Sequence, residues 1–169
     1  MKTMDNHDKR WTVIYSTFKF FKGAIMECDI SNISMPGDAG IKDIFSMCKS
    51  IAIIGLSPDP TKDSHKVARY LQEQGFKIYP IYPKEETILG EKVYRNLSEI
   101  PDEVDMVNMF RKPEIADSLI EEVLKKGDVK VFWLQLGIIN NQACAKAQEN
   151  GLKAVQNRCT KIEYERLIK

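Results

Sequence analysis

The chain has 169 residues, of which 43% are hydrophobic and 29% charged, and its 25 basic and 24 acidic residues give a net charge of +1. This length suits one domain of ordinary size, and the apolar fraction is too high for a disordered chain. The near-balance of charge lacks the electropositive footprint of most nucleic-acid binders. We therefore expect no nucleic acid as a partner and a local site for any anionic ligand.

The apolar segments of the chain are too short to cross a membrane, because none approaches the ~20 residues that a bilayer requires. The segment WTVIYSTFKFFKGAIM faintly resembles a signal peptide, but Lys19 and Lys22 interrupt it and no clean cleavage site follows. The four cysteines are widely spaced, without a C-x-x-C pair, at Cys28, Cys48, Cys144 and Cys159. This pattern favours free thiols in a reducing cytosol, so we expect a cytoplasmic protein without a metal site and without a membrane partner.

Residues 1–40 differ from the rest of the chain, because they lack helical periodicity and end in the turn-rich segment MPGDAG. We expect these residues to form an N-terminal arm, and residues 41–169 to form the folded domain. The run Thr12–Phe18 is interpreted as an edge strand or as a segment that packs on a partner, which is compatible with a homodimer.

From Ile41 onward, helical and strand-like patterns alternate. Apolar spacing predicts helices at residues 41–48, 64–74, 115–126, 141–150 and 161–168, and strands at residues 51–54, 76–82, 105–110, 129–134 and 152–155. Strands that alternate with glycine-terminated helices predict an α/β domain with a doubly wound parallel sheet of about five strands and helices on both faces. Ligands of such sheets bind beyond the carboxyl ends of the strands, here in the loops after Ile54, Tyr82, Phe110 and Leu134.

The loop after the first strand combines a glycine turn with the start of a helix, which favours a phosphate or diphosphate group. Gly55, Ser57 and Pro60 occupy the three glycine positions of the G-x-G-x-x-G fingerprint, so the fingerprint is incomplete. A plain strand-to-helix turn is the alternative interpretation of Gly55, and a turn residue that of Ser57.

Three further polar residues lie in or just after this loop. Lys62 stands where a phosphate would bind, although a solvated lysine is the common alternative. Ser64 is expected to be the N-cap of the following helix. His65 is a candidate for a phosphate contact, with a surface histidine as the alternative.

The end of the second strand carries Tyr82, Pro83 and Lys84, where NAD-binding folds usually place an acidic residue. A lysine suits a phosphorylated ribose better than a bare diol. Coenzyme A (CoA) carries a 3′-phosphate and NADP a 2′-phosphate, so both ligands stay open at this point. Lys84 also has a structural alternative, which is to offset the charges of Glu85 and Glu86.

Five segments together resemble the small stand-alone CoA-binding proteins of bacteria, which are related to the CoA-binding Rossmann domain of succinyl-CoA synthetase. They are SIAIIGLSPDPTKDSHKVARYLQEQGFKIYPIYP, ILGEKVYRNLSEIP, VNMFRKPE, VFWLQLGIIN and NRCTKIEYERL, and they cover roughly residues 42–167. The resemblance implies a Rossmann-like fold with CoA as the ligand. The residues that it places at the ligand are Gly55, Leu56, Ser57, Pro83, Lys84, Phe110, Arg111, Lys112, Trp133, Gln135 and Gly137. Tyr82 departs from the family, which more often has asparagine between the two prolines.

The residues after the later strands have their own interpretations. Arg111 can bind a phosphate with two hydrogen bonds, or it can pair with Glu114 or Asp117. Trp133 lies in an apolar strand and is expected in the core, whereas Gln135 can bond an amide of a pantetheine arm.

Catalytic groups are scarce, since the two histidines belong to no nucleophile arrangement and no segment resembles the phosphorylated-histidine loop of the synthetase. We therefore expect a cytosolic, non-catalytic module that binds CoA or an acyl-CoA. The alternatives are an NADP-binding enzyme or redox sensor, and an interaction subunit with a vestigial nucleotide pocket. Cys159 gives one further hypothesis, a mixed disulfide with the CoA thiol, against the alternative of a free buried thiol.

Overall fold

The computed structural model describes residues 33–169, so the predicted strand at Thr12–Phe18 lies outside the described residues. The elements follow in chain order as α1 (Asp38–Met47), β1 (Ser50–Ile54), α2 (Asp63–Glu73), β2 (Lys77–Ile81), β3 (Thr87–Ile88), β4 (Glu91–Lys92), the 3₁₀ helix η2 (Leu97–Glu99), β5 (Met106–Met109), α3 (Ile115–Lys126), β6 (Val131–Leu134), α4 (Asn141–Glu149), β7 (Lys153–Val155) and α5 (Thr160–Leu167). Helix α1 begins at Asp38 and so includes the last three residues of the segment expected as an arm.

Five of the strands form one parallel sheet in the order β2-β1-β5-β6-β7. Within the sheet, the chain therefore runs first through the central strand β1 and then through its neighbour β2. It returns to the other side of β1 at β5 and continues outward to β6 and β7. The strand order reverses between β1 and β5, and this is the place where doubly wound sheets bind their ligands. The predicted fold class is confirmed.

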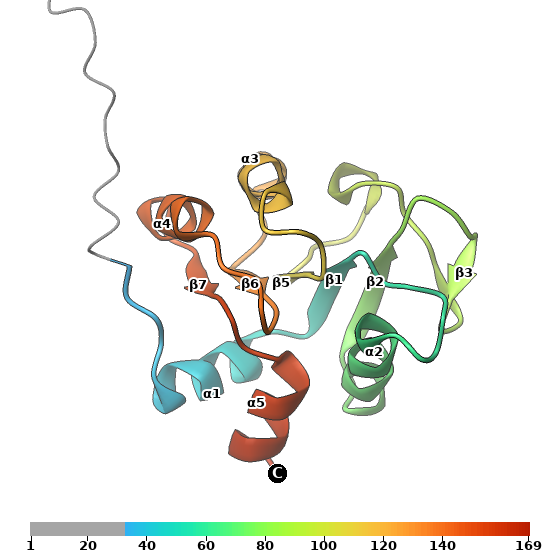
Figure 1. Cartoon of the computed structure of the whole chain (residues 1–169), viewed down its shortest axis with the longest axis horizontal. Coiled ribbons are helices and arrows are strands. Elements are labelled where there is room, and N and C mark those ends of the chain that lie inside the picture. Colours follow the sequence, from blue (N-terminus) through green and yellow to red (C-terminus); the bar gives the residue numbers. More distant parts are fainter. Residues whose placement is uncertain (1–32) are drawn as a thin grey trace, which may run out of the picture.

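The sheet is covered by helices on both faces, which gives three layers (Figure 1). Helices α1, α2 and α5 lie on one face, and α3 and α4 lie on the other. Successive residues of a strand point to opposite faces. Accordingly Ile51 and Ile53 of β1 pack with the first group of helices, while Ala52 and Ile54 pack with the second.

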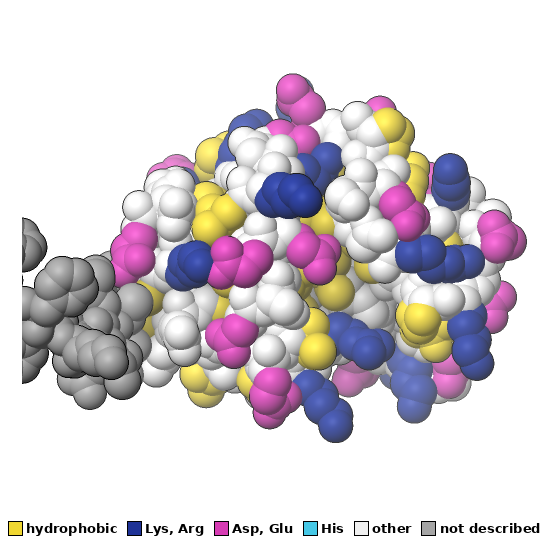
Figure 2. Space-filling view, turned by 90° about the horizontal axis from the view of Figure 1, so that it is seen from above, with side chains coloured by type: hydrophobic (Ala, Val, Ile, Leu, Met, Phe, Trp, Pro, Cys, Tyr) yellow, Lys and Arg dark blue, Asp and Glu magenta, His cyan; other side chains and the backbone are white. Residues whose placement is uncertain are grey.

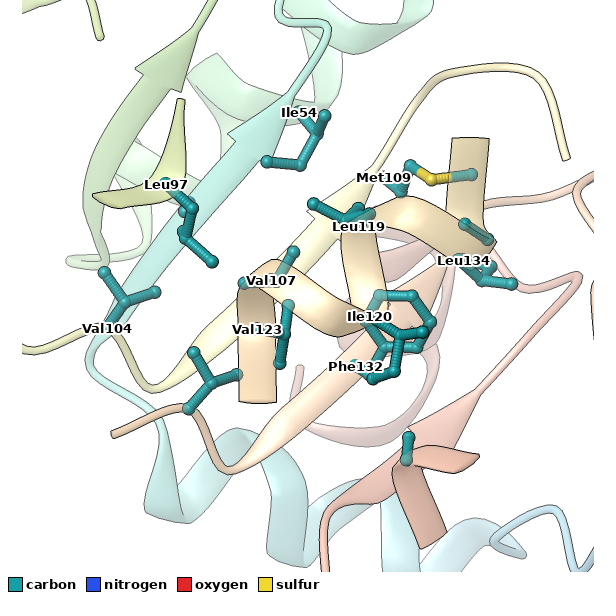
Figure 3. Packing of buried hydrophobic residues seen from close by; sticks show 14 of the residues in the cluster. Ile54, Leu97, Val104, Val107, Met109, Leu119, Ile120, Val123, Phe132 and Leu134 are labelled. Atoms are coloured by element: carbon teal, nitrogen blue, oxygen red, sulfur yellow. The ribbon is translucent and has the colours of Figure 1, made fainter. Parts of the chain in front are cut away.

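The two apolar layers are built from the periodic residues of the helices. On one face, Leu119, Ile120 and Val123 of α3 lie against Val107 and Phe132 of the sheet (Figure 3). All five side chains are at most 4% exposed. The apolar spacing in the sequence therefore marks this buried face at Leu119, Ile120 and Val123, but Ile115 at the start of the helix is 40% exposed. Gly127 ends the helix with φ +82°, as predicted.

The opposite layer joins the two ends of the domain. Phe45 of α1 contacts Tyr164 of α5 with ring centroids 5.1 Å apart, and Arg166 of α5 forms an ion pair with Asp38 at the start of α1. This arrangement places α1 and α5 side by side beneath the sheet (Figure 1).

The segment between β2 and β5 contains a short hairpin and η2, which the sequence pattern does not predict. Strands β3 and β4 have two residues each, too few to show an alternation. The hairpin returns the chain to β2, where the N–H of Tyr82 donates to the carbonyl of Tyr94 at 3.1 Å. The segment thereby brings Arg95 beside the end of β2.

The surface over α3 and α4 mixes lysine and arginine with aspartate and glutamate, and the hydrophobic atoms between them form small groups (Figure 2). Among residues 33–169, no helix is long and apolar enough to span a membrane, and no group of three or more metal-ligating side chains is found.

Candidate functional site

The turn after β1 lies at the strand-order reversal and contacts the end of β5. Gly55 has φ +84°, a conformation that side chains other than glycine rarely adopt. A Cβ at Gly55 would stand 2.6 Å from Cδ of Arg111, so the arginine side chain packs directly on the bare backbone of the turn. Gly55 thus serves both the turn and the close approach of Arg111, and its ligand contact stays a prediction.

The backbone amides of the turn are only partly available to a ligand. The N–H of Gly55 donates to the carbonyl of Ile81 at 2.9 Å, and the N–H of Ser57 donates to Oγ of Ser64 at 3.1 Å. The N–H of Leu56 has no acceptor among the described residues, although Leu56 is fully buried. Unpaired buried amides are rare in proteins. The N–H groups of Gly55 and Ser57 are therefore already used within the protein, and the residue that carries the third N–H, Leu56, is buried.

Hydrogen bonds within the loop fix its shape. Oγ of Ser57 accepts from the N–H of Asp59 at 3.2 Å, and Nδ1 of His65 lies 2.9 Å from the carbonyl of Ser57, to which it donates. The N–H and hydroxyl of Thr61 both donate to Asp59, and these bonds hold the pKa of its carboxyl below the usual value. The Nδ1 atom of His65 is therefore used for a hydrogen bond that stabilises the loop.

Helix α2 begins without a capping side chain. The N-cap is Lys62 and not Ser64, so the predicted cap is wrong, because the Ser64 hydroxyl accepts from Ser57 across the loop instead. An uncapped helix start leaves first-turn N–H groups and the positive end of the helix dipole available to an anion. Lys62 is exposed at this point.

One cavity, the Tyr82 cavity, has a volume of about 230 Å³ and lies between the ends of β1 and β2. It is lined by Ile54, Gly55, Ile81, Tyr82, Pro83, Arg95, Arg111 and Ile115. Arg111 is exposed and forms no ion pair with Glu114 or Asp117 within residues 33–169, so the pairing alternative is wrong. Its guanidinium therefore has no acidic partner here.

Arg95 is a site residue that the sequence reasoning missed. Its Nη1 lies 2.9 Å from the carbonyl oxygens of Tyr82, Lys84 and Glu85, and it holds the turn after β2 in shape. Glu85 has φ +64° in this turn. Arg95 belongs to the segment ILGEKVYRNLSEIP, which carries part of the family resemblance. Its distance from Lys84 along the chain, however, does not indicate that Arg95 contacts the turn around Lys84.

Two of the lysines expected at the ligand, Lys84 and Lys112, follow directly in the chain on residues that line this cavity. Lys84 is exposed in the turn that Arg95 braces, and Lys112 is exposed in the loop between β5 and α3. Lys84 forms no ion pair with Glu85 or Glu86 among the described residues, while Glu86 pairs with Arg95 at 3.4 Å.

A second cavity, the Cys159 cavity, has a volume of about 560 Å³ and lies between α2, α5 and the ends of β5 and β6. It is lined by Asp63, Lys66, Val67, Phe110, Gln135, Leu136, Ile138, Cys159, Lys161, Ile162 and Glu165. Its volume falls within the ~300–1,000 Å³ of small-molecule sites. Phe110 lines this cavity and its neighbour Arg111 lines the Tyr82 cavity, so both cavities border the end of β5.

Gln135 is the buried polar residue of the Cys159 cavity, at 3% exposure. Its Nε2 donates to Oδ1 of Asn108 at 2.9 Å and to Oγ1 of Thr160 at 2.7 Å. Asn108 lies in the centre of the sheet and gave no signal in the sequence, because a single asparagine in an apolar strand has no periodic partner.

Trp133 and Gly137 are among the residues that the resemblance places at the ligand but that line neither cavity. Trp133 is fully buried in the core and its Nε1 donates to the carbonyl of Arg158 at 2.7 Å, so the core interpretation is confirmed and a lining role is wrong. Gly137 is exposed, and its N–H donates to Oδ1 of Asn157 at 2.8 Å. A ligand contact of Gly137 stays a prediction.

Comparisons with known proteins identify close relatives of this arrangement. A family model described as a CoA binding domain matches residues 49–165. The uncharacterised protein YneT of Bacillus subtilis is 36% identical over 129 residues, which cover 76% of this chain and 95% of that protein. The alpha subunit of an ADP-forming acetate–CoA ligase II of Pyrococcus furiosus is 32% identical over 117 residues, which cover 69% of this chain and 26% of the subunit.

Solved structures of the same size also match. A hypothetical protein from Pyrococcus horikoshii OT3 has a TM-score of 0.76 and 41% identity, over 79% of this chain and 94% of that chain. The structure of cell-free ID.343 from Thermus thermophilus has a TM-score of 0.74 and 32% identity, over 78% of this chain and 99% of that chain. The fold thus occurs both as a small protein and as a quarter of a ligase subunit.

Proposed function

The chain belongs to the CoA-binding domain family, as the motif resemblance predicts, and from this premise we propose that it binds CoA or an acyl-CoA as a stand-alone, non-catalytic module. The observation that carries the proposal is the contact of Arg111 with Gly55 at the strand-order reversal, with the Tyr82 cavity lined by Arg111 and the Cys159 cavity lined by its neighbour Phe110. A ligand with a nucleotide at one end, a diphosphate in the middle and a long arm at the other end matches this layout.

In this proposal the diphosphate lies over the turn after β1. The uncapped start of α2 and the guanidinium of Arg111 supply donors and positive charge to it. The adenosine occupies the Tyr82 cavity against Pro83. Lys84 and Arg95 stand at the same end and suit the 3′-phosphate of the ribose.

The arm of the ligand enters the Cys159 cavity past Phe110. The apolar residues Val67, Ile138 and Ile162 suit the hydrocarbon parts of that arm. The proposal stops at binding, because the chain spans only 26% of the acetate–CoA ligase subunit that it resembles. The ligase reaction is therefore not carried over.

NADP is the competing ligand, since the cations beside the Tyr82 cavity suit a 2′-phosphate as well as a 3′-phosphate. Titration calorimetry and thermal unfolding of the full chain with CoA, acetyl-CoA, NAD and NADPH separate the two ligand classes. A ligand at ~100 times its dissociation constant adds about 2.7 kcal/mol to the unfolding free energy.

For a chain of this size we expect CoA or acetyl-CoA at that concentration to raise the unfolding midpoint by roughly 5–10 °C. A shift with NADPH and none with CoA would overturn the proposal in favour of an NADP-binding protein. If no nucleotide shifts the midpoint or releases heat on titration, the interaction-subunit alternative replaces it.

A further inference from the structure

The Cys159 cavity contains one buried amide whose hydrogens are both already used. Nε2 of Gln135 donates one hydrogen to Asn108 and the other to Thr160. No described residue donates to Oε1 of Gln135, and this oxygen is not among the fully buried atoms without a partner. The side chain lines the cavity, so the group that it still offers to a ligand is a hydrogen-bond acceptor.

The contacts themselves determine the orientation of this amide. Oγ1 of Thr160 accepts from Nδ2 of Asn108 at 3.2 Å as well as from Gln135. In this arrangement the side chains of Gln135, Asn108 and Thr160 make three contacts with one another, and an amide hydrogen is donated in each of them. If both amides were reversed, two carbonyl oxygens would face one Thr160 hydroxyl, which has a single hydrogen to donate. The reversed orientation therefore leaves one contact repulsive.

The backbone also holds Gln135 in place. Its N–H approaches the carbonyl of Met109 at 3.3 Å, and its own carbonyl accepts from the N–H of Ile138 at 2.9 Å. Asn108 and Thr160 are fully buried and do not line the cavity. Both bond directly to the amide of Gln135, so they can influence a ligand through the orientation of that amide.

We propose that Oε1 of Gln135 accepts a hydrogen bond from a secondary amide N–H of the ligand's arm, and that Asn108 and Thr160 are positioning residues that keep this oxygen as the acceptor. The inference rests on the proposed function, because the pantetheine arm of CoA carries two secondary amides. It adds a recognition element for the arm, independent of the phosphate contacts at the other end.

The test compares CoA with adenosine 3′,5′-bisphosphate, which has the nucleotide but lacks the arm. Gln135→Met keeps the length of the side chain and removes the acceptor. We expect this variant to weaken CoA about 10-fold, while the affinity for the bisphosphate changes less than 2-fold. Equal losses for the two ligands, or no loss for either, would overturn the inference.

Thr160 provides a matched pair that leaves Gln135 in the chain. Thr160→Val removes the acceptor at almost constant shape, and we expect it to weaken CoA about 3- to 10-fold without affecting the bisphosphate. Thr160→Ser retains the oxygen and should restore CoA affinity to within 2-fold of the original chain. A loss of CoA affinity in Thr160→Val that Thr160→Ser does not restore, or an equal loss for the bisphosphate, would overturn the positioning role of Thr160.

A measurement on the unaltered chain covers the case in which the variants fold poorly. A crystal structure with CoA should place an amide nitrogen of the arm within hydrogen-bond distance of Oε1 of Gln135. An arm that binds elsewhere would overturn this inference and leave the proposed function intact. A full chain that binds neither CoA nor the bisphosphate would overturn both.

Discussion

Gly55 shows how one residue without a side chain determines the shape of the site. Its positive φ and the Arg111 side chain packed on it are two separate constraints. Gly75, which follows α2, has φ +94°, but a Cβ at this position would meet no atom within 4 Å, so Gly75 shares the first constraint only. The two glycines therefore form a matched pair for experiment.

We predict that Gly55→Ala and Gly75→Ala both lower the unfolding free energy by about 1–2 kcal/mol, because each forces alanine into a left-handed conformation. Only Gly55→Ala must displace Arg111 as well, so we expect only this variant to lose CoA affinity, by 10-fold or more. Urea unfolding and titration calorimetry measure the two effects. Unchanged CoA affinity in Gly55→Ala would contradict the placement of the diphosphate.

Lys84 tests the nucleotide end of the site. It is exposed, so the contribution of its charge is screened by water and should be modest. We predict that Lys84→Ala weakens CoA about 2- to 5-fold at low salt and leaves dephospho-CoA, which lacks the 3′-phosphate, unchanged. Lys42→Ala on α1 serves as the control for a lost surface charge. Equal losses for both ligands would remove the 3′-phosphate role from Lys84.

Cys159 differs from the two other described cysteines by its place in a cavity. Burial raises the pKa of the thiols of Cys48 and Cys144 to about 12, so both should remain unreactive at neutral pH. Treatment with CoA disulfide should let the Cys159 thiolate attack one sulfur, form a protein–CoA disulfide and release one CoA thiolate. In a chain that carries Cys28→Ser, because Cys28 lies outside the described residues, we predict one reducible CoA adduct by intact-mass spectrometry, and none when Cys159→Ser is added. A chain that shows no adduct would reject the mixed-disulfide hypothesis.

At the scale of elements, Asp105 joins three segments of the chain at the start of the sheet. Its carboxylate accepts from the N–H groups of Lys49 and Ser50 at 2.8 and 3.1 Å and pairs with Lys130 at 2.6 Å. Burial opposes the charge, but Lys130 and the two N–H groups hold the pKa of this carboxyl below its usual value. These bonds link the starts of β1 and β5 to Lys130 just before β6.

We predict that Asp105→Asn lowers the unfolding free energy by about 1–3 kcal/mol at pH 7. The pKa of Asp105 is depressed in the folded state, so its charge contributes stability above the unfolded-state pKa of ~3.9. This contribution is lost as the pH falls through the folded-state pKa. The difference between the two chains in urea unfolding should therefore shrink at acid pH. A constant difference, or one matched by the exposed control Asp43→Asn, would contradict the prediction.

The succession of strands and helices along the chain could be predicted from the sequence, because the apolar residues of each element recur with the spacing of a strand or of a helix. The five sheet strands and five helices lie within a few residues of their predicted bounds. The hairpin β3–β4, the N-cap at Lys62 and the role of Arg95 could not be predicted in this way. Each depends on contacts between segments, such as Ser57 with Ser64 or Arg95 with the turn after β2.

At the scale of the whole molecule, α1 closes the layer that also contains α5. Its residues Ile41, Ile44 and Phe45 are at most 5% exposed, and Asp38 pairs with Arg166 at the far end of the chain. The family match begins only at residue 49, after this helix. The helix is therefore part of the packed domain although it precedes the matched segment.

We predict that a chain starting at Ile33 keeps the unfolding midpoint and CoA affinity of the full chain, whereas one starting at Lys49 loses its fold. Burial of each large apolar side chain contributes about 1.5–3 kcal/mol, and domains of ordinary size have only about 5–15 kcal/mol in total. Circular dichroism melts and CoA titration measure both chains. A cooperative melt at the original midpoint for the chain from Lys49 would contradict this account, as would lost CoA affinity in the chain from Ile33.

The sequence by itself determined the α/β class, the family resemblance and the loops that carry the candidate site. It could do so because hydrophobic period, glycine positions and local motifs are properties of short segments. Only the tertiary structure decided which donors remain free, how Arg111 packs on Gly55, and that Asn108 and Thr160 fix the amide of Gln135. Those features join residues from segments far apart in the chain, and hydrogen bonds between such segments leave no periodic signal along it.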